Sequence, residues 1–512
     1  MIAADALDAI PGARLIGDSK VCLGPISFDS RQVQAGGVFV ALPGTVEDGA
    51  HYVADAFARG AAMAVVEREG ALPSGHTGLV VPSARLALAL LSARFNGWPA
   101  RSLRVAGITG TDGKTTTTSL LAAILRAAQR RVGVVTTVQA NVIGRAFDTG
   151  FHTTTPDAPD LQRYLRMMVE SDVQDAVLEV TSHGLAQDRV VGCEFDLAVV
   201  TNVTSDHLDF HGDPEAYLAA KLKLFESLGT AMRKPGVAKG IAYNLDERSA
   251  PAIDRIWSER RLSYALERHA DVRARAVRQY SAKTAFDIEA PGFSFPVEMP
   301  LVGWYNVANA LAASAAALLW DVPIEAIQEG LATFSGIPGR LERIDLGQPF
   351  DVVVDFAHTP NSLEQVLRLQ RAVCRRQLSI VFGCAGLRDR QKRPVMGAIA
   401  GQFADRIYLT AEDPRTESVD DIIEQIVAGC RDVGRREGTD FWRVPDRREA
   451  IERAIAEAKP GDVVLVTGKG HERSMCFGRN ESPWNDCDVV RDILESRFGA
   501  TRSSTNPPLS SH

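Results

Sequence analysis

The chain has 512 residues, enough for about three domains, and its 45% hydrophobic and 24% charged residues are typical of folded globular proteins. Its net charge of −7 argues against a protein that binds nucleic acid or an anionic membrane surface. Seven scattered cysteines, with no pair spaced Cys-x-x-Cys, predict a reducing compartment, the cytoplasm, and no structural zinc.

The amino-terminal residues carry no signal for export. Residues 1–8 have no basic start and no apolar stretch of signal-peptide length. The longest apolar run, residues 310–320, is alanine-rich and too short to cross a bilayer, so it predicts a packed helix. We therefore expect no membrane insertion.

The first segment, residues 1–101, alternates short apolar runs with helical stretches. It ends near an Asn-Gly-Trp-Pro turn at residues 96–99. This pattern predicts a small α/β domain. Its strands are expected at residues 26–28, 38–42, 63–66 and 79–81.

The second segment, residues 102–337, opens with an apolar run, a glycine-rich loop and a helical pattern at residues 116–128. Two later runs, residues 175–181 and 197–203, are β-rich and almost continuously apolar. Such runs are typical of strands buried on both faces of a parallel sheet. We predict a central parallel-sheet domain of the phosphate-loop type.

The last segment, residues 338–499, repeats strand and helix regularly, which predicts a Rossmann-like α/β domain. Its strands are expected at residues 352–357, 378–383, 406–410 and 463–468, with helices such as 362–374 and 420–433 between them. The tail, residues 500–512, is rich in Ser, Thr and Pro and is expected to be disordered. The predicted fold class is therefore α/β with three domains.

Residues 107–116 read Gly-Ile-Thr-Gly-Thr-Asp-Gly-Lys-Thr-Thr and lie between a predicted strand and a predicted helix. Glycines permit a tight turn that points backbone N–H groups at phosphate oxygens. Lys114 adds a positive charge, and the Thr115 hydroxyl can coordinate the Mg²⁺ that accompanies ATP. Ile108 stands where the commonest form of this loop has glycine, and an ordinary glycine-rich turn is the alternative. The candidate ATP-binding residues are Gly110, Thr111, Asp112, Gly113, Lys114, Thr115 and Thr116.

Two further candidate groups follow the predicted central strands. Glu179 lies near the end of residues 175–181, and His207 comes after the next strand. Neighbouring parallel strands end at one crevice, where a carboxylate and an imidazole suit magnesium bound to phosphate oxygens. Each residue alone has a structural alternative, an ion pair for Glu179 and a buried histidine for His207. Together with the phosphate loop they predict a metal site.

These motifs resemble those of the Mur ligases, ATP-dependent enzymes that add amino acids to the peptidoglycan precursor. The resemblance covers almost the whole chain and is strongest for the MurE type, which adds the third amino acid to UDP-MurNAc-L-Ala-D-Glu. It also rests on residues 29–31, 179–183, 201–212, 303–309, 339–342, 355–360, 392–394 and Thr467-Gly-Lys-Gly-His-Glu472. It implies a uridine-nucleotide-binding first domain, an ATPase central domain and an amino-acid-binding last domain.

The resemblance also implies a mechanism. ATP phosphorylates the terminal carboxylate of the precursor, and the amine of a diamino acid attacks the acyl phosphate. The implied catalytic residues are Lys114, Glu179, His207 and Lys221. Mg²⁺ is expected at Thr115, Glu179, His207 and a carbamate on Lys221. The sequence alone shows only two helix lysines there, Lys221 and Lys223.

By the same resemblance, all three domains contribute to substrate binding, and hinged closure between them is expected. ATP is expected to contact Asn306, Arg340 and Asp355. The precursor is expected at Ser30, Thr154, Thr155, Thr181, Gln187 and Arg189, and the diamino acid at Arg388, Asp413, Arg415, Gly468 and Glu472. We expect the chain to act as a monomer.

The chain departs from the family pattern at residues 412 and 413 and at residue 112. The diaminopimelate-type signature is Asp-Asn-Pro-Arg, whereas residues 412–415 read Glu-Asp-Pro-Arg. Arg415 can bind a carboxylate in a bidentate way, but an acid at Asp413 favours an ammonium group. We rank meso-diaminopimelate ahead of L-ornithine and L-lysine. Asp112 replaces the usual asparagine, and an acid there repels a triphosphate unless it is turned away or caps the helix; we predict that it caps the following helix.

Other functional classes remain open. A folylpolyglutamate-synthetase-like ligase shares the nucleotide domain, but residues 467–472 argue against it. A non-catalytic nucleotide-binding paralogue is disfavoured because Lys114, Glu179, His207 and Lys221 are all present. A phosphate-loop kinase or GTPase would lack the motifs of the third segment.

Overall fold

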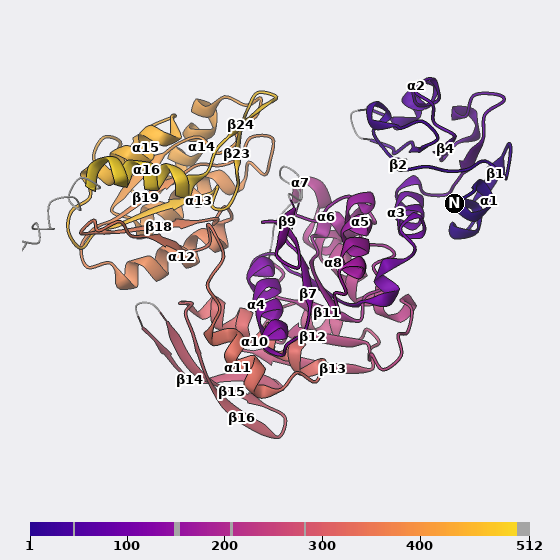
Figure 1. The fold of residues 1–512 in the computed structure, drawn as a ribbon. Coiled ribbons are helices and arrows are strands. Elements are labelled where there is room, and N and C mark those ends of the chain that lie inside the picture. Colours follow the sequence, from indigo (N-terminus) through magenta and orange to yellow (C-terminus); the bar gives the residue numbers. More distant parts are fainter. Residues whose placement is uncertain (45–46, 148–153, 205–207, 281–282, 499–512) are drawn as a thin grey trace, which may run out of the picture.

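The computed structural model describes residues 1–44, 47–147, 154–204, 208–280 and 283–498. Figure 1 shows three α/β bodies, each built on its own sheet, with the central body between the other two. The fold class predicted from the sequence is confirmed. The predicted boundaries near residues 101 and 337 fall in the segments between the sheets, and His207 and the tail 500–512 lie outside the described residues.

The first body holds a five-stranded sheet in the order β1-β5-β4-β3-β2, antiparallel only at β1. All four strands expected from the sequence are present. Helix α3 of this body packs against α5 (Ala158–Glu170) of the central body, and this contact joins the two bodies. The elements are α1 (Ala3–Ala9), β1 (Arg14–Ile16), β2 (Ile26–Ser27), β3 (Val38–Val40), α2 (Val53–Ala58), β4 (Met63–Val66), β5 (Gly78–Val80) and α3 (Ala84–Phe95).

The central body holds an eleven-stranded sheet in the order β16-β15-β14-β13-β12-β11-β6-β10-β7-β8-β9. Its strands are β6 (Arg104–Thr109), β7 (Val132–Val135), β8 (Ala140–Val142), β9 (Arg145–Phe147), β10 (Asp175–Glu179), β11 (Leu197–Val200), β12 (Gly240–Asn244), β13 (Arg260–Ala265), β14 (Val272–Gln279), β15 (Thr284–Ala290) and β16 (Phe293–Met299). Its helices are α4 (Lys114–Ala127), α5 (Ala158–Glu170), α6 (Ser182–Ala186), α7 (Leu208–His211), α8 (Pro214–Thr230), α9 (Ala250–Ile253), α10 (Trp304–Leu319) and α11 (Ile324–Ala332).

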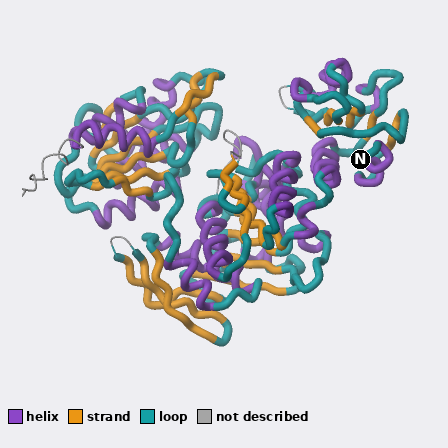
Figure 2. Tube along the Cα trace, in the orientation of Figure 1, coloured by secondary structure: helices purple, strands orange, loops and turns teal. Residues whose placement is uncertain are grey.

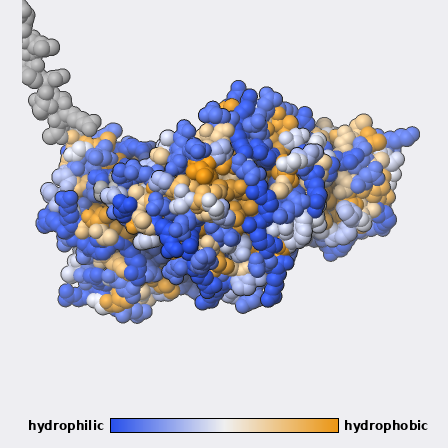
Figure 3. Space-filling view, turned by 90° about the horizontal axis from the view of Figure 1, so that it is seen from below, coloured by the Kyte–Doolittle hydropathy of each residue, from blue (hydrophilic) through white to orange (hydrophobic). Residues whose placement is uncertain are grey.

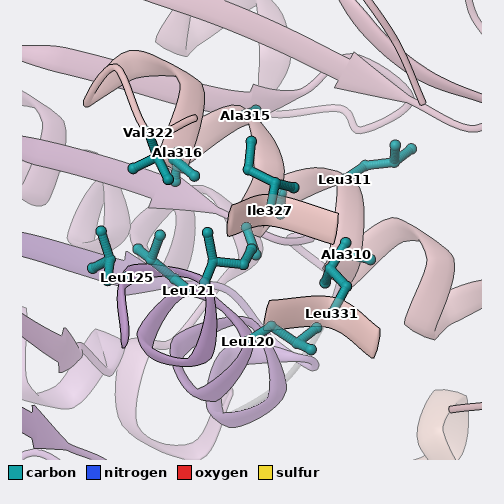
Figure 4. Close-up of a cluster of buried hydrophobic side chains, with 14 of the residues drawn as sticks. Leu120, Leu121, Leu125, Ala310, Leu311, Ala315, Ala316, Val322, Ile327 and Leu331 are labelled. Carbon is teal, nitrogen blue, oxygen red and sulfur yellow. The ribbon is translucent and has the colours of Figure 1, made fainter. Parts of the chain in front are cut away.

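Both faces of this sheet are covered, as its continuously apolar strands predict. Helices α4, α10 and α11 pack on one face, where Leu121, Ala316 and Ile327 belong to one buried cluster (Figure 4). Helices α5 and α8 pack on the other face. The alanine-rich run 310–320 is thus a packed helix, as predicted, because small side chains let α10 approach α4 closely.

The two ends of the central sheet were not predicted. Strands β8, β9, β15 and β16 pair antiparallel, and β14 to β16 extend from the body as a ribbon (Figure 2). Residues along β16 alternate between exposed and buried, so this strand covers the core with one face only. Such alternating, partly polar runs give a weaker strand signal than the buried parallel strands.

The last body holds a six-stranded sheet, order β17-β18-β22-β19-β20-β21, and a separate two-stranded hairpin. Helices cover both faces of the larger sheet, around two buried clusters. The strands are β17 (Glu342–Ile344), β18 (Asp351–Asp355), β19 (Leu378–Phe382), β20 (Arg406–Leu409), β21 (Phe441–Arg443), β22 (Val463–Thr467), β23 (Ser474–Phe477) and β24 (Asn480–Pro483). The helices are α12 (Pro360–Val373), α13 (Lys392–Phe403), α14 (Val419–Asp432), α15 (Arg447–Glu457) and α16 (Asp486–Phe498).

The face shown in Figure 3 is mainly hydrophilic. On the face shown in Figure 3, apolar residues form patches separated by hydrophilic ones. None of the helices in the described part of the chain is both long and apolar enough to span a membrane.

Strand register places the site. Strand β6 lies between β10 and β11, all three parallel, with Glu179 paired to Ile108 and Val200 paired to Thr109. The segments that follow these strands therefore start at one level, on one edge of the sheet. This edge is where open parallel sheets bind ligands.

The opposite edge contains a buried ionic cluster. Asp196 is fully buried and accepts hydrogen bonds from Lys239 Nζ (2.9 Å), Lys234 Nζ and the backbone N–H of Val105 (2.9 Å). Burial lowers the pKa of Lys234, and the Asp196 carboxylate opposes that effect. One carboxylate thus holds two buried ammonium groups beside strands β6 and β11.

Replacing Asp196 by Asn should destabilise the central body, because two buried ammonium groups would then face a neutral amide. We expect a loss of about 3–5 kcal/mol in the free energy of unfolding, measured from the urea transition of this body. Asp321→Asn is the matched control, since it breaks an exposed pair with Arg260 and should cost less than about 1 kcal/mol. Equal shifts for the two variants would contradict a structural role for the cluster.

Candidate functional site

The phosphate loop joins β6 to α4 and has a backbone that only glycine fits at two positions. Gly110 has φ +153°, and a methyl group there would lie 1.8 Å from Thr201 Oγ1. Gly113 has φ +80°, and a methyl group there would lie 2.3 Å from Asn309 Oδ1. The glycines of the motif are therefore required both for backbone conformation and for close packing.

Two residues that follow β11 hold this loop in place. The Asn202 side chain accepts from the N–H of Asp112 (2.9 Å) and donates to its carbonyl (3.0 Å). The Thr201 hydroxyl donates to the same carbonyl (2.6 Å), and the N–H of Thr111 donates to the carbonyl of Asn202 (2.8 Å). The N–H groups of Thr111 and Asp112 are thus already bound within the protein.

The N–H groups left for an anion are those of the first turn of α4. The first intrahelical bond in this helix runs from Thr117 N–H to the carbonyl of Gly113. The N–H groups of residues 113–116 therefore precede it and have no intrahelical acceptor. Lys114 Nζ lies beside them and donates to the carbonyls of Thr111 (2.7 Å) and Gly110 (3.1 Å). This geometry is that of a phosphate site at a helix N-terminus.

Glu179 is buried at the end of β10, next to the loop. Its carboxylate accepts hydrogen bonds from Thr115 Oγ1 (2.9 Å), Thr137 N (3.0 Å) and Thr137 Oγ1 (3.0 Å). These donors are neutral, and within the described part of the chain Glu179 has none of the ion pairs considered as its alternative role. A hydroxyl and a carboxylate side by side supply the hard oxygen ligands that Mg²⁺ prefers.

Lys221 is buried on α8 beneath the loop. Its Nζ donates to the carbonyl of Gly110 (2.7 Å) and lies 4.4 Å from the centre of the Tyr217 ring. The Tyr217 hydroxyl in turn lies 3.0 Å from Thr111 Oγ1. Lys221 thus lies beside the phosphate loop, and both its catalytic role and its carbamylation stay predictions.

A cleft of about 430 Å³ joins the loop to the last body. From the candidates it collects Thr111, Asp112, Gly113, Lys114, Thr115, Thr116, Thr154, Thr155, Glu179, Thr181, Arg189, Arg340, Arg388, Asp413, Arg415, Gly468 and Glu472. Gly110, Ser30, Gln187, Lys221, Asn306 and Asp355 are not in its lining. Residues from the ends of strands in both bodies thus face one space.

On the central side, four candidates form a connected group. Arg189 donates to Gln187 Oε1 (2.8 and 3.0 Å) and to the carbonyl of Thr155 (2.8 Å), and it lies 3.1 Å from the Asp157 carboxylate. Thr155 Oγ1 lies 3.1 Å from Thr181 Oγ1. Gln187 therefore orients Arg189 at the cleft without lining it. Ser30 is buried in the first body, outside the cleft.

On the opposite side, the structure changes the interpretation of Asp413. Its carboxylate accepts from Lys469 Nζ (2.8 Å) and from the N–H of Cys476 (2.9 Å). Lys469 is fully buried and also pairs with Glu472. Burial alone would lower the pKa of Lys469, but the two carboxylates raise it, so the lysine stays charged. Lys469 therefore offsets the negative charge of Asp413 within the protein, although it shares its own charge with Glu472.

Arg415 is held by its backbone. Its N–H donates to the carbonyl of Cys476 (3.0 Å), and its carbonyl accepts from the N–H of Gly478 (2.7 Å), both on the β23–β24 hairpin. Its guanidinium donates to the carbonyl of Gly386 (3.1 Å), in the segment that carries the exposed Arg388. The hairpin thus fixes the start of this side chain at the cleft.

Glu412 is a cleft residue to which the sequence analysis gave no role. It packs against Gly468, where a methyl group would lie 2.3 Å from its Oε2. This buried oxygen has no hydrogen-bond partner among the described residues. Burial raises the pKa of Glu412 to about 8, with Lys392 and Arg447 opposing the shift.

The three residues expected to contact ATP lie around the junction of the two bodies. The Arg340 guanidinium stacks 4.3 Å from the centre of the Phe356 ring. Asp355 accepts from the N–H groups of Leu341 (2.7 Å) and Ala357 (2.8 Å), and burial raises its pKa. Asn306 is buried on α10 and lies 3.3 Å from Asn309. Arg340 alone of the three lines the cleft.

The prediction that Asp112 caps α4 is wrong. The N-cap residue is Gly113, and no side chain caps this helix. The Asp112 carboxylate instead accepts a hydrogen bond from Asn361 Nδ2 (2.9 Å), at the start of α12 in the last body. The local preference of aspartate for helix N-termini is overridden by a partner 249 residues away.

Several residues with clear contacts were missed, chiefly Thr137, Thr201, Asn202, Glu412 and Lys469. Thr201 and Asn202 belong to the segment 201–212, and Lys469 belongs to the segment 467–472, but nothing in the sequence showed which group each would contact. Thr137 follows β7, and its position after an apolar strand could have predicted that it lies at the ligand-binding edge of the sheet.

The donors present fit magnesium in part. Thr115 and Glu179 supply oxygens beside the N-terminus of α4, where phosphate oxygens would complete a hard ligand set. The described residues contain no cluster of three His, Cys, Asp or Glu that could hold a metal alone. Such a site depends on ligands from a bound nucleotide, which is the usual arrangement for magnesium.

Three family models match the chain: the Mur ligase family catalytic domain at residues 25–96, the Mur ligase middle domain at 108–317 and the Mur ligase glutamate ligase domain at 339–470. UDP-N-acetylmuramyl-tripeptide synthetase of Roseiflexus sp. (strain RS-1) is 43% identical, over 92% of this chain and 94% of its own. UDP-N-acetylmuramoyl-L-alanyl-D-glutamate--2,6-diaminopimelate ligase of Bacillus licheniformis is 39% identical, over 92% of this chain and 94% of its own.

A solved structure of a 2,6-diaminopimelate ligase with the same full name is 32% identical. It covers 92% of this chain and 94% of its own, with a TM-score of 0.64. The similarity therefore extends through all three bodies and includes the phosphate loop and the cleft. The chain belongs to the Mur ligase family, whose members are ATP-dependent ligases that form peptide bonds.

Proposed function

We propose that the chain joins a diamino acid to UDP-MurNAc-L-Ala-D-Glu at the expense of ATP, and that the diamino acid is meso-diaminopimelate. One observation carries the proposal: a single cleft contains the phosphate loop of the central body and the Arg388, Arg415 and Glu472 side chains of the last body. The first group suits a nucleotide, and the second suits a molecule with carboxylate and ammonium ends.

The reaction has two steps. The terminal carboxylate oxygen of the precursor attacks the γ-phosphorus of ATP, and ADP leaves. The amine nitrogen then attacks the acyl carbon, phosphate leaves, and the nitrogen loses a proton as the amide forms. Both steps need positioned partners and stabilisation of negative charge. Lys114 and the first-turn N–H groups of α4 bind phosphate oxygens, while Arg189 binds the precursor.

Bound Mg²⁺ would supply positive charge to the phosphate oxygens during transfer. Thr115 and Glu179 would hold it, with His207 and a carbamate on Lys221 as further proposed ligands. A carbamate forms only on the neutral amine of a lysine, and Lys221 is buried beside the loop. Asn306, Arg340 and Asp355 would contact the remainder of the nucleotide.

The pairing of Asp413 with Lys469 decides our choice of diamino acid. If the carboxylate were uncompensated, it would favour an ammonium group and disfavour the second carboxylate of diaminopimelate. Lys469 offsets part of the negative charge of Asp413 and Glu472, and Arg415 and Arg388 add two positive charges to the cleft, while Glu472 and Gly468 would face the distal ammonium group. This balance favours a ligand with a carboxylate at its distal end.

The first body would bind the uridine end of the precursor through Ser30, with Thr154, Thr155, Thr181 and Gln187 completing the path to Arg189. We also propose that the chain acts as a monomer in the cytoplasm. All seven cysteines are unpaired, which suits a reducing compartment.

Two substitutions separate the phosphate and metal roles. Lys114→Met should lower ATP-dependent phosphate release by about 10²–10³-fold, because it removes a charge that faces the transferred group. Glu179→Gln should cause a smaller loss that increasing Mg²⁺ partly restores, because the amide keeps the shape of the carboxylate but binds the metal weakly. Lys283→Met, at an exposed lysine of the distant β14–β16 ribbon, is the control. A Glu179→Gln defect independent of Mg²⁺ concentration would argue against the metal role.

The amino acid is tested by phosphate release with ATP, Mg²⁺ and UDP-MurNAc-L-Ala-D-Glu, with each diamino acid added separately. We expect the highest kcat/KM with meso-diaminopimelate, and a loss of about 100-fold for Arg415→Met, equivalent to charge-assisted hydrogen bonds of a few kcal/mol. The kcat/KM of the Arg415→Met variant for L-lysine should stay within about threefold of that of the original chain, since L-lysine lacks the distal carboxylate.

Arg431→Met is the matched control, because Arg431 is a half-exposed arginine on α14 paired with Glu424 and Glu437. Preference for L-lysine or L-ornithine would overturn the choice of diaminopimelate. If the protein binds ATP but releases no phosphate with any of the three amino acids, the ligase assignment is overturned.

A further inference from the structure

The backbone of Asp112 is fixed to the central body, but its side chain reaches the last body. Its N–H and carbonyl are bound by Asn202 and Thr201, so the peptide cannot turn freely. Its Oδ2 nevertheless accepts from Asn361 Nδ2 at 2.9 Å. The contact therefore joins the phosphate loop directly to the first turn of α12.

The surroundings of Asn361 favour a carboxylate. Helix α12 begins at Pro360, with Thr359 as N-cap and a capping box to Ser362. Its N-terminus carries partial positive charge, and Asn361 adds a neutral N–H donor directed at Asp112. Both features stabilise a negative side chain that comes from the other body.

The alternative position for the Asp112 carboxylate is unfavourable. Lys114 and the free N–H groups that suit phosphate lie within four residues of it, so a carboxylate turned toward them would repel a triphosphate. At the junction it also meets like charge, because Asp112 is one of the groups that raise the pKa of Asp355. A neutral amide at Asn361 is therefore the partner that lets this acid stay beside a phosphate site.

We infer that Asp112 and Asn361 form a positioning pair: their hydrogen bond directs the Asp112 carboxylate away from the nucleotide and links ATP binding to the approach of the last body. The inference rests on the proposed nucleotide site, but not on the identity of the amino acid. By linkage, if the contact between the bodies strengthens ATP binding by a given factor, ATP binding strengthens the contact by the same factor.

The test is a cycle of two isosteric substitutions on the full chain, with ATP affinity measured by calorimetry in the absence of any amino acid. Asn361→Asp places two carboxylates face to face and should weaken ATP binding about tenfold, or roughly 1.4 kcal/mol. Asp112→Asn should weaken ATP binding less than Asn361→Asp does, because two amides can still form one hydrogen bond. The double variant, which exchanges donor and acceptor, should restore the affinity lost in Asn361→Asp.

Gln365→Glu is the control for added charge, since Gln365 is an exposed residue one turn further along α12. Its effect should be small and should not depend on residue 112. Small-angle scattering with ADP bound should show Asn361→Asp expanded relative to the original chain and the double variant restored. Thermal unfolding of each variant checks that all of them fold.

Failure of Asp112→Asn to rescue Asn361→Asp would overturn the inference, as would a loss of ATP binding in Asp112→Asn alone, which would indicate a direct role of the carboxylate at the nucleotide. Rescue of ATP affinity without any amino-acid-dependent phosphate release would support the pair while contradicting the proposed ligase reaction. The two conclusions are therefore tested separately.

Discussion

The hydrogen bonds from Thr201 and Asn202 to the phosphate loop are the constraint on which the site depends. They come from the segment after β11, so they exist only because β11 lies beside β6 in the register that pairs Val200 with Thr109. On the other side of β6, the register of β10 brings Glu179 to the level of Ile108. The buried parallel sheet therefore does more than stabilise the body, because it sets the loop, the carboxylate and the hydroxyl of Thr115 at one edge.

Charge compensation organises the opposite side of the cleft. Buried ions are tolerated only when they are paired and hydrogen-bonded, and Lys469 meets this requirement with two carboxylates. A ligand in the cleft therefore interacts with the net charge that is left after this internal pairing. Counting charged residues along residues 412–415 would give the wrong balance, since one of the acids has a buried lysine as its partner.

The sequence predicted the elements that are buried and continuous, and it missed those that depend on distant partners. Strands such as β10 and β19 are apolar throughout, so their pattern left little ambiguity. The ribbon β14–β16 has mixed polarity and was not predicted. Placement of the candidates followed from strand ends meeting at one edge, a topological rule that sequence patterns can use. The orientation of Asp112 and the charge state around Asp413 could not be predicted in this way, because each depends on one contact with a residue 249 or 56 positions away.

The contacts of the charged groups bear on how the cleft binds its substrates. Lys114 donates to two loop carbonyls, Lys221 donates to Gly110, and Glu179 accepts from two threonines. A phosphate oxygen that binds Lys114 therefore replaces backbone carbonyl acceptors. The net gain in binding free energy is smaller than the full strength of the new interaction. Affinity must then depend on contacts that need no such exchange, namely the first-turn N–H groups of α4 and the groups that the last body brings. A nucleotide site divided between two bodies in this way binds well only when the bodies approach, which is the condition under which water leaves and an acyl phosphate can persist.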